Sequence, residues 1–164
     1  MGVRTRLARR IAPLTTNRRS RRVMKRIVPR LDAGVARLTG GRYRLTDAVL
    51  PTLVLHHTGR RSGRDRSVVL AAMPDGDGFV VIGSNWGQTT HPGWALNVTE
   101  RPEVEMEVRG RRQPMTARRL TGAERDEAWT RMAALWPVYD RYMASAGGRE
   151  LRVFRLEPAE DRRR

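Results

Sequence analysis

Short strand-forming runs separated by turns dominate the chain from Pro51 onward. The runs richest in β-forming residues are Thr52–His57, Ser67–Met73 and Phe79–Gly83. Residues 74–78 read Pro-Asp-Gly-Asp-Gly, which predicts a turn that joins the last two runs into a hairpin. In residues 103–108 valine and methionine alternate with glutamate, a pattern typical of a strand with one solvent-exposed face. Antiparallel pairing of these runs is therefore expected.

Two more strands are expected towards the C-terminal end. A turn at Gly110 joins residues 103–108 to a partner strand that runs through Thr116–Leu120. Leu151–Leu156 forms the last strand. A meander of this kind with inserted or flanking helices predicts an α+β fold built on a small barrel closed on itself.

Helical signals lie between and before the strands. His91 and Pro92 open a short helix that runs through Val98. The pair Thr121 and Glu124 has the spacing of a capping box, in which each side chain bonds a free backbone N–H at the start of a helix that runs to about residue 137.

The basic charge of the chain is concentrated at its N-terminus. Of 164 residues, 33 are Lys or Arg and 17 are Asp or Glu, which gives a net charge of +16. Residues 1–31 hold eleven of the basic residues and no acid. Apolar residues recur there at helical spacing, with a break around Thr15–Asn17, and Pro29 is expected to open the next helix. We therefore expect a basic amphipathic arm (1–28), a globular body (29–158) and a basic tail (159–164).

Composition excludes several kinds of chemistry. The sequence has no cysteine, so disulfides, thiolate catalysis and iron–sulfur or zinc–thiolate sites are absent. No apolar run approaches the roughly 20 residues of a membrane-spanning helix, and arginines interrupt every apolar run that could serve as a secretory signal. A cytoplasmic location is expected.

The most suggestive segment is the arginine-rich turn at residues 58–66, Thr-Gly-Arg-Arg-Ser-Gly-Arg-Asp-Arg. Its two glycines permit a tight turn, and its four arginines offer charge-assisted donors to phosphate or carboxylate oxygens. The alternative is a polar hairpin turn in an arginine-rich protein. Taken by themselves, the residues leave both interpretations open.

Other chemistry is weakly represented. His56 and His57 point to opposite faces of a strand and have no acid at ligand spacing, so no metal site is expected. No nucleophile–base pair is evident, and an enzyme of this sequence would rely on an organic cofactor. Tyr139 and Tyr142 lie three residues apart on one helical face, with Trp136 one turn earlier. Core packing accounts for Trp136, whereas the two tyrosines could line the mouth of a pocket.

The basic arm has three possible roles. It could bind nucleic acid, bind anionic lipid as a basic amphipathic helix, or remain a solvated arm. Residues 1–42 contain no aromatic side chain for base stacking, which disfavours nucleic acid. Contact with an anionic membrane is the favoured interaction.

Four segments, in order along residues 30–158, carry a resemblance to a known family. They are 53–66 (containing His-His-Thr-Gly-Arg-Arg-Ser-Gly-Arg-Asp-Arg), 75–85 (containing Phe-Val-Val-Ile-Gly-Ser-Asn), 92–97 (Pro-Gly-Trp-Ala-Leu-Asn), and 136–142 (Trp-Pro-Val-Tyr-Asp-Arg-Tyr) followed by 153–158. Together they resemble the deazaflavin-dependent nitroreductase and quinone reductase family.

The resemblance implies a split β-barrel of the FMN-binding type that binds the deazaflavin coenzyme F420, with FMN the less favoured cofactor. It implies hydride transfer from reduced F420 to a quinone, a nitro compound or a similar small acceptor. The alternative is a non-enzymatic protein whose basic arm binds anionic membrane or nucleic acid.

The resemblance also implies roles for individual residues. Arg61 and Arg66 fall where the family holds the coenzyme's phosphate, although the family has lysine at the position of Arg61. The cofactor-binding set is Arg60, Arg61, Ser62, Arg66, Ile82, Gly83, Ser84, Asn85, Trp94 and Asn97. The catalytic set is Ser84, Tyr139 and Tyr142, and the substrate pocket is formed by Trp136, Tyr139 and Tyr142. Trp86 departs from the family pattern and is expected to reshape the pocket for the ring.

Overall fold

The computed structural model describes residues 18–40, 45–48 and 50–159. In chain order the elements are α2 (Arg18–Leu38), the short 3-10 helix η1 (Leu45–Ala48), β1 (Thr52–Thr58), β2 (Asp65–Asp75), β3 (Gly78–Ile82), the 3-10 turn η2 (Asn85–Gly87), α3 (Gly93–Glu100), β4 (Glu103–Val108), β5 (Arg111–Arg119), α4 (Gly122–Leu135), α5 (Val138–Ser145) and β6 (Val153–Pro158). Most of the predicted arm, residues 1–17, and nearly all of the predicted tail lie outside the described residues.

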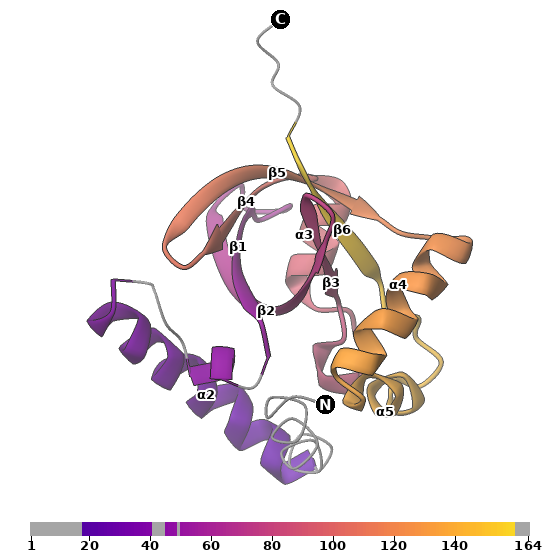
Figure 1. Ribbon diagram of the computed structural model, residues 1–164. Coiled ribbons are helices and arrows are strands. Elements are labelled where there is room, and N and C mark those ends of the chain that lie inside the picture. The colour runs from indigo at the N-terminus through magenta and orange to yellow at the C-terminus, as the bar shows by residue number, and fades with distance from the viewer. Residues whose placement is uncertain (1–17, 41–44, 49, 160–164) are drawn as a thin grey trace, which may run out of the picture.

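The six strands form a closed antiparallel barrel in the order β1-β2-β3-β6-β5-β4 (Figure 1). Leu55 of β1 shows the closure, since it lies opposite Val68 of β2 on one side and Met106 of β4 on the other. Each of the six strands therefore has a neighbour on both sides, although residues 65–71 of β2 pair with β1 alone. The predicted α+β fold with a small barrel is confirmed.

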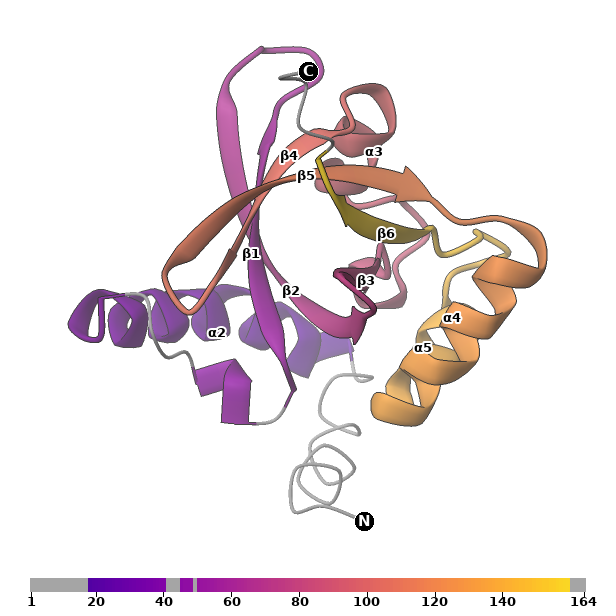
Figure 2. The same cartoon turned by 45° about the horizontal axis from the view of Figure 1, so that its top comes forward.

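The helices lie outside the barrel at different places. Helices α4 and α5 lie together beside β6, and α2 lies on another side, below β1 and β2 (Figures 1 and 2). The short helix α3 contacts β1 and β5. Because α3 follows the β3 strand and its loop, it brings residues of the middle of the chain next to the turn between β1 and β2.

Strand β3 separates two hydrophobic clusters. Val81 faces the barrel interior with Leu55 and Phe154, whereas Val80 and Ile82 face a second cluster formed with α4 and α5. Strand side chains alternate between the two faces of a sheet, so a strand covered on both faces is apolar throughout. This explains why residues 79–83 lack the polar alternation seen in β4.

Helix α2 differs from the prediction. It continues from Arg18 to Leu38 as one helix, so the predicted helix start at Pro29 is wrong. Proline lacks a backbone N–H and removes one hydrogen bond of a helix interior. The other twenty residues of the helix outweigh this single loss.

The predicted capping box at α4 is also wrong. Thr121 stands at the N-cap but makes no side-chain hydrogen bond there. The Glu124 carboxylate instead accepts two hydrogen bonds, of 2.7 and 2.6 Å, from the guanidinium of Arg118 on β5. A bidentate pair with arginine is a stronger interaction than a bond to one backbone N–H.

Candidate functional site

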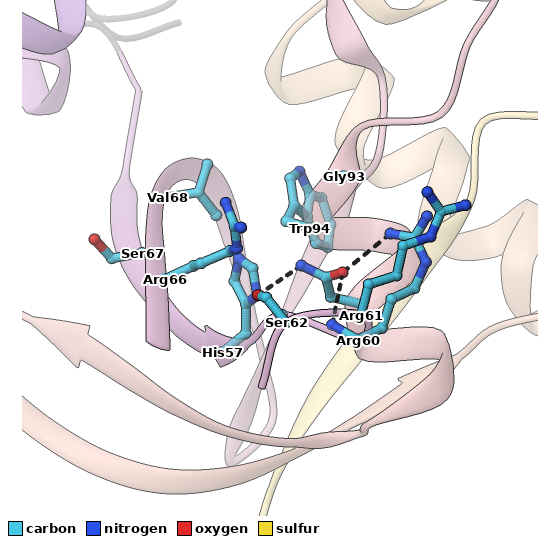
Figure 3. Close-up of a pocket in the computed structure, with 11 residues that line it drawn as sticks. His57, Arg60, Arg61, Ser62, Arg66, Ser67, Val68, Gly93 and Trp94 are labelled. Atoms are coloured by element: carbon cyan, nitrogen blue, oxygen red, sulfur yellow. Dashed lines mark hydrogen bonds between the residues drawn. The ribbon is translucent and has the colours of Figure 1, made fainter. Parts of the chain in front are cut away.

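A cleft of about 530 Å³ lies between the β1–β2 turn and helix α3 (Figure 3). Its lining residues are His57, Gly59, Arg60, Arg61, Ser62, Arg66, Ser67, Val68, Gly93, Trp94 and Asn97. Six of the residues predicted to bind the cofactor are among them: Arg60, Arg61, Ser62, Arg66, Trp94 and Asn97. The structure therefore brings together two segments that are about thirty residues apart in the sequence.

Close backbone approach at Gly59 shapes the turn. The Gly59 N–H donates to the Arg64 carbonyl (2.8 Å), and the Gly63 N–H donates to the Gly59 carbonyl (2.8 Å). A Cβ atom on Gly59 would lie 2.7 Å from Ser62 Oγ and 2.9 Å from Arg66 Nε. A larger residue at this position would displace the Ser62 and Arg66 side chains, so glycine allows Arg66 to lie close over the turn.

Positive charge dominates this side of the cleft. Arg60 is partly neutralised, since its Nε lies 3.2 Å from an oxygen of Glu100. Within the described part of the chain, Arg61 and Arg66 have no acidic side chain at ion-pair distance. Two uncompensated guanidinium groups at one cleft are suited to an anionic ligand.

Asn97 connects the turn to the floor of the cleft. Its Oδ1 accepts hydrogen bonds from the backbone N–H of Arg60 (3.2 Å) and from Arg60 Nη1 (3.1 Å). Its Nδ2 must then point the other way, towards His57 Nδ1 at 3.2 Å (Figure 3). Because an amide NH₂ is only a donor, His57 Nδ1 accepts and the ring is neutral, with its proton on Nε2.

The environment of His57 favours this neutral form. Burial lowers the pKa of His57, and the positive charges of Arg66 and His56 lower it further, while a hydrogen bond with the backbone of Thr58 acts in the opposite direction. If His57 Nδ1 were protonated, its N–H would face the Asn97 Nδ2 amino group, and two donors would meet without an acceptor. We conclude that His57 is neutral at pH 7.

Trp94 supplies the aromatic wall of the cleft. It is 8% exposed, and its ring packs on Phe154 of the barrel interior with centroids 5.5 Å apart. The indole lies across the cleft from Arg66 (Figure 3). A fixed aromatic surface beside cationic groups suits a ligand that has both a flat ring and an anionic part.

Four predicted cofactor residues lie behind this wall and do not line the cleft. Ile82 ends β3 inside the second hydrophobic cluster, and Gly83, Ser84 and Asn85 form the loop that follows. A Cβ on Gly83 would lie 3.2 Å from the Cβ of Ala95, so this loop packs against α3. In this conformation it supports the cleft from outside.

The predicted substrate residues are buried elsewhere. Trp136, Tyr139 and Tyr142 are 7%, 4% and 5% exposed and belong to the cluster beside α4 and α5. The rings of Tyr139 and Tyr142 meet edge to face at 6.2 Å. Burial raises the pKa of Tyr139 well above its ordinary value, which keeps its hydroxyl protonated. Their catalytic and substrate roles, like that of Ser84, stay predictions, since the structure does not bring them to the cleft.

Sequence reasoning missed several residues of the cleft. His57, Gly59, Ser67, Val68 and Gly93 line it without having been assigned to it. His57 was considered only as a metal ligand. Its position one residue before the arginine-rich turn was the available signal.

A second depression of about 610 Å³ adjoins the first. It shares His57, Arg66 and Ser67 with the cleft, and its other lining residues are His56, Thr58, Asp65, Glu103, Val104, Glu105 and Arg112. Acidic and basic groups are mixed there, and His56 Nε2 lies 3.0 Å from a Glu107 carboxylate oxygen. Among the described residues, no three metal-ligating side chains come together, and no helix is long and apolar enough to span a membrane.

Comparison with known proteins decides the family. The family described as F420H(2)-dependent quinone reductase matches residues 27–158. The chain belongs to this family. The F420H(2)-dependent quinone reductase Rv1261c of Mycobacterium tuberculosis is 31% identical over 118 residues, which cover 71% of this chain and 75% of that protein.

Solved structures agree with this membership in the reductase family. An F420-H2 dependent reductase (FDR-A) is 30% identical with a TM-score of 0.60, and the match covers 65% of this chain and 94% of that one. A structure described as a domain-swapped dimer is 29% identical with a TM-score of 0.62, covering 76% and 94% of the two chains. The predicted family, the oxidoreductase class and coenzyme F420 are confirmed. The non-enzymatic alternative gains no support.

Proposed function

We propose that this chain is an F420H2-dependent quinone reductase that holds the anionic part of the coenzyme in the cleft between the β1–β2 turn and α3. The observation that carries this is the placement of Arg61 and Arg66, uncompensated among the described residues, beside the wall formed by Trp94. Family membership supplies the coenzyme and the quinone, and the cleft supplies cations and an aromatic surface that fit them.

Six residues of the cleft have a physical role in this proposal: His57, Arg60, Arg61, Arg66, Trp94 and Asn97. Arg61 and Arg66 bind phosphate or carboxylate oxygens, and Asn97 holds Arg60 and the turn in place through its two accepted hydrogen bonds. Trp94 packs against a flat ring and excludes water from that side. Neutral His57 adds no further positive charge to the floor of the cleft.

When bound and reduced, F420 supplies a hydride to the acceptor. The chain's contribution is to bind and orient, since holding two reactants in a productive geometry removes much of the entropic cost of their meeting. Tyr139 and Tyr142 are 4% and 5% exposed and lie in the core, so this conformation does not present their hydroxyls to the cleft.

Equilibrium titration with F420, FMN and FAD tests the proposal, together with oxidation of F420H2 by a soluble quinone. We expect F420 to bind at least about tenfold more tightly than FMN, a difference of about 1.4 kcal/mol, and F420H2 to be oxidised only when quinone and protein are both present. Equal binding of FMN, with no oxidation of F420H2, would refute it.

We further propose that the N-terminal region brings the enzyme to anionic membrane as a peripheral protein. Helix α2 contains eight basic residues and one acid, Asp32, which is buried and bonded to Thr46. Four apolar side chains on one face of α2 are exposed to solvent: Val23, Ile27, Leu31 and Leu38. An apolar stripe beside basic residues is typical of a helix that lies in the interface of anionic lipid.

A quinone dissolved in a membrane would be the acceptor such a location favours. The exposed apolar stripe and the positive charge of α2 support binding to anionic membrane, and sedimentation of the protein with anionic vesicles tests it. The cytoplasmic side of the membrane stays a prediction.

A further inference from the structure

Three consecutive residues in the loop after β3 adopt left-handed backbone conformations. Their φ angles are 46° at Asn85, 56° at Trp86 and 68° at Gly87. Left-handed backbone is unfavourable for residues with a Cβ, and tryptophan has no special tolerance for it. Such strain persists only where surrounding contacts fix the backbone, and it is common near functional sites.

The Arg149 guanidinium bonds to backbone carbonyls that flank this turn on both sides. Arg149 lies in the segment between α5 and β6. Its Nη2 donates to the carbonyls of Ser84 (2.8 Å) and Gln88 (2.8 Å), its Nε donates to Gln88 (3.0 Å), and its Nη1 donates to Gly83 (3.2 Å). Within the described residues, Arg149 has no carboxylate at ion-pair distance. Its charge is directed at backbone carbonyls on both sides of the strained turn.

Helix α5 provides a second anchor at Gly87. Ser145 Oγ donates to the Gly87 carbonyl at 3.0 Å. A Cβ on Gly87 would lie 2.9 Å from the Cα of Tyr142, so the turn is pressed against the helix. The Trp86 ring lies beside the Tyr142 ring, with centroids 6.4 Å apart.

This clamped loop leads directly to the cleft. The loop ends at His91, whose Nδ1 lies 3.4 Å from Arg149 Nη1, and Pro92 then caps the start of α3. Gly83 packs on α3 at Ala95. The first turn of α3 carries Gly93 and Trp94, which line the cleft, and Asn97 follows them. Movement of the loop would therefore move the aromatic wall.

We propose that Arg149 is a positioning residue for coenzyme binding. It holds the left-handed turn Asn85–Gly87 and thereby sets the position of Trp94 and Asn97 relative to Arg61 and Arg66. Arginine is required because lysine has a single nitrogen and cannot reach carbonyls of three residues with a planar fork. The proposal deepens the proposed function and depends on the cleft being the coenzyme site.

Replacement of Arg149 by lysine tests this. We expect Arg149→Lys to raise the dissociation constant for F420 by about tenfold or more, because several charge-assisted hydrogen bonds are lost. We also expect it to weaken the near-ultraviolet circular dichroism of the coenzyme-free protein, since the Trp86–Tyr142 contact loosens. The control is Arg131→Lys, which changes an exposed arginine paired with Asp75 and is expected to leave both quantities unchanged.

Ser145→Ala keeps the test decisive if Arg149→Lys does not fold. It removes one hydrogen bond to Gly87 and is expected to weaken F420 binding about fivefold. Hydrogen exchange of amides 83–91 in coenzyme-free protein is expected to accelerate in both variants. Wild-type binding and exchange in folded Arg149→Lys, or in Ser145→Ala if the lysine variant is unfolded, would overturn the role of the clamp.

The two proposals fail in different ways. If wild-type protein does not bind F420, the proposed function fails, whatever Arg149 does. If wild-type protein binds F420 and Arg149→Lys binds it equally well with unchanged circular dichroism, only the positioning role fails.

Discussion

Asn97 Oδ1 accepts hydrogen bonds from both the backbone N–H and the side chain of Arg60, at 3.2 and 3.1 Å. One amide oxygen on α3 thus fixes the turn between β1 and β2 to the helix on the other side of the cleft. Arg60 is thirty-seven residues away in the chain. Together with the ion pair between Arg60 and Glu100, this side chain links the cationic turn to the helix that carries the aromatic wall.

Asn97→Ala is expected to weaken F420 binding about tenfold. The substitution leaves the Arg60 N–H and His57 Nδ1 without partners, and an unsatisfied buried group costs about 1–3 kcal/mol. Coenzyme fluorescence titration measures the effect. Thr99→Ala is the matched control, since Thr99 lies on the same helix and, within the described part of the chain, bonds to Ala95 and Arg152. Equal affinity of Asn97→Ala and wild type would contradict the role of Asn97.

The stability of the protein is expected to decrease as the pH falls below 6.5. Burial lowers the pKa of His57 and of His91 below the ordinary value of 6.5, so the folded state binds fewer protons than the unfolded chain in this range. Their contribution is complete above pH 6.5 and is lost as the pH falls through the lowered pKa values. Urea unfolding at a series of pH values measures it.

His57→Gln separates the contribution of His57 to this pH dependence of stability from that of His91. Glutamine keeps a polar partner for Asn97 but does not titrate, so the pH dependence of stability below pH 6.5 should become shallower. An identical slope in the variant and the wild type would show that His57 is not responsible.

The exposed apolar face of α2 is expected to be necessary for membrane binding. Ile27→Asp combined with Leu31→Asp should reduce sedimentation with vesicles that contain phosphatidylglycerol by about tenfold, because both side chains leave the interface. Raised salt should also weaken binding of the wild type, since lipid charge is screened. Val69→Asp on β2 is the control, because Val69 is an exposed apolar residue outside α2. Undiminished sedimentation of the double variant would exclude α2 as the contact.

Phe154→Ala should destabilise the barrel and loosen the cleft together. Phe154 is fully buried, and its ring packs against the Trp94 ring with centroids 5.5 Å apart. A buried phenylalanine replaced by alanine costs about 3–5 kcal/mol, measurable by urea unfolding, and Trp94 loses its support. Val69→Ala, at an exposed position, should change stability by no more than about 0.5 kcal/mol. If Phe154→Ala lowers the free energy of unfolding only slightly, packing of the barrel interior is not what holds Trp94 in place.

Local patterns predicted the barrel strands well. In β4 the alternation of valine and methionine with glutamate predicted the observed first and last residues of the strand, because one face is exposed to solvent and the other is buried. The arginine-rich turn was found from its glycines and arginines, and the choice of Arg61 and Arg66 within it came from the resemblance. These features depend on residues close together in the chain.

Features that depend on distant residues were not predictable in this way. Glu124 fitted a capping box, but Arg118 on another element holds it. Arg149 is one of 33 basic residues, and nothing in its neighbours indicates that it bonds to carbonyls more than sixty residues away. Tyr139 and Tyr142 were placed at the pocket by resemblance, whereas their burial follows from the packing of α4 and α5.

The dissociation constant of F420 for Arg61→Glu tests the central claim most directly. Arg61 has no ion-pair partner among the described residues, so reversing its charge removes an anchor without breaking a contact of the fold. We predict a loss of affinity of at least about tenfold, with an unchanged unfolding temperature. Arg131→Glu, far from the cleft in a pair with Asp75, should bind F420 normally. Wild-type affinity in Arg61→Glu would contradict the assignment of this cleft to the coenzyme.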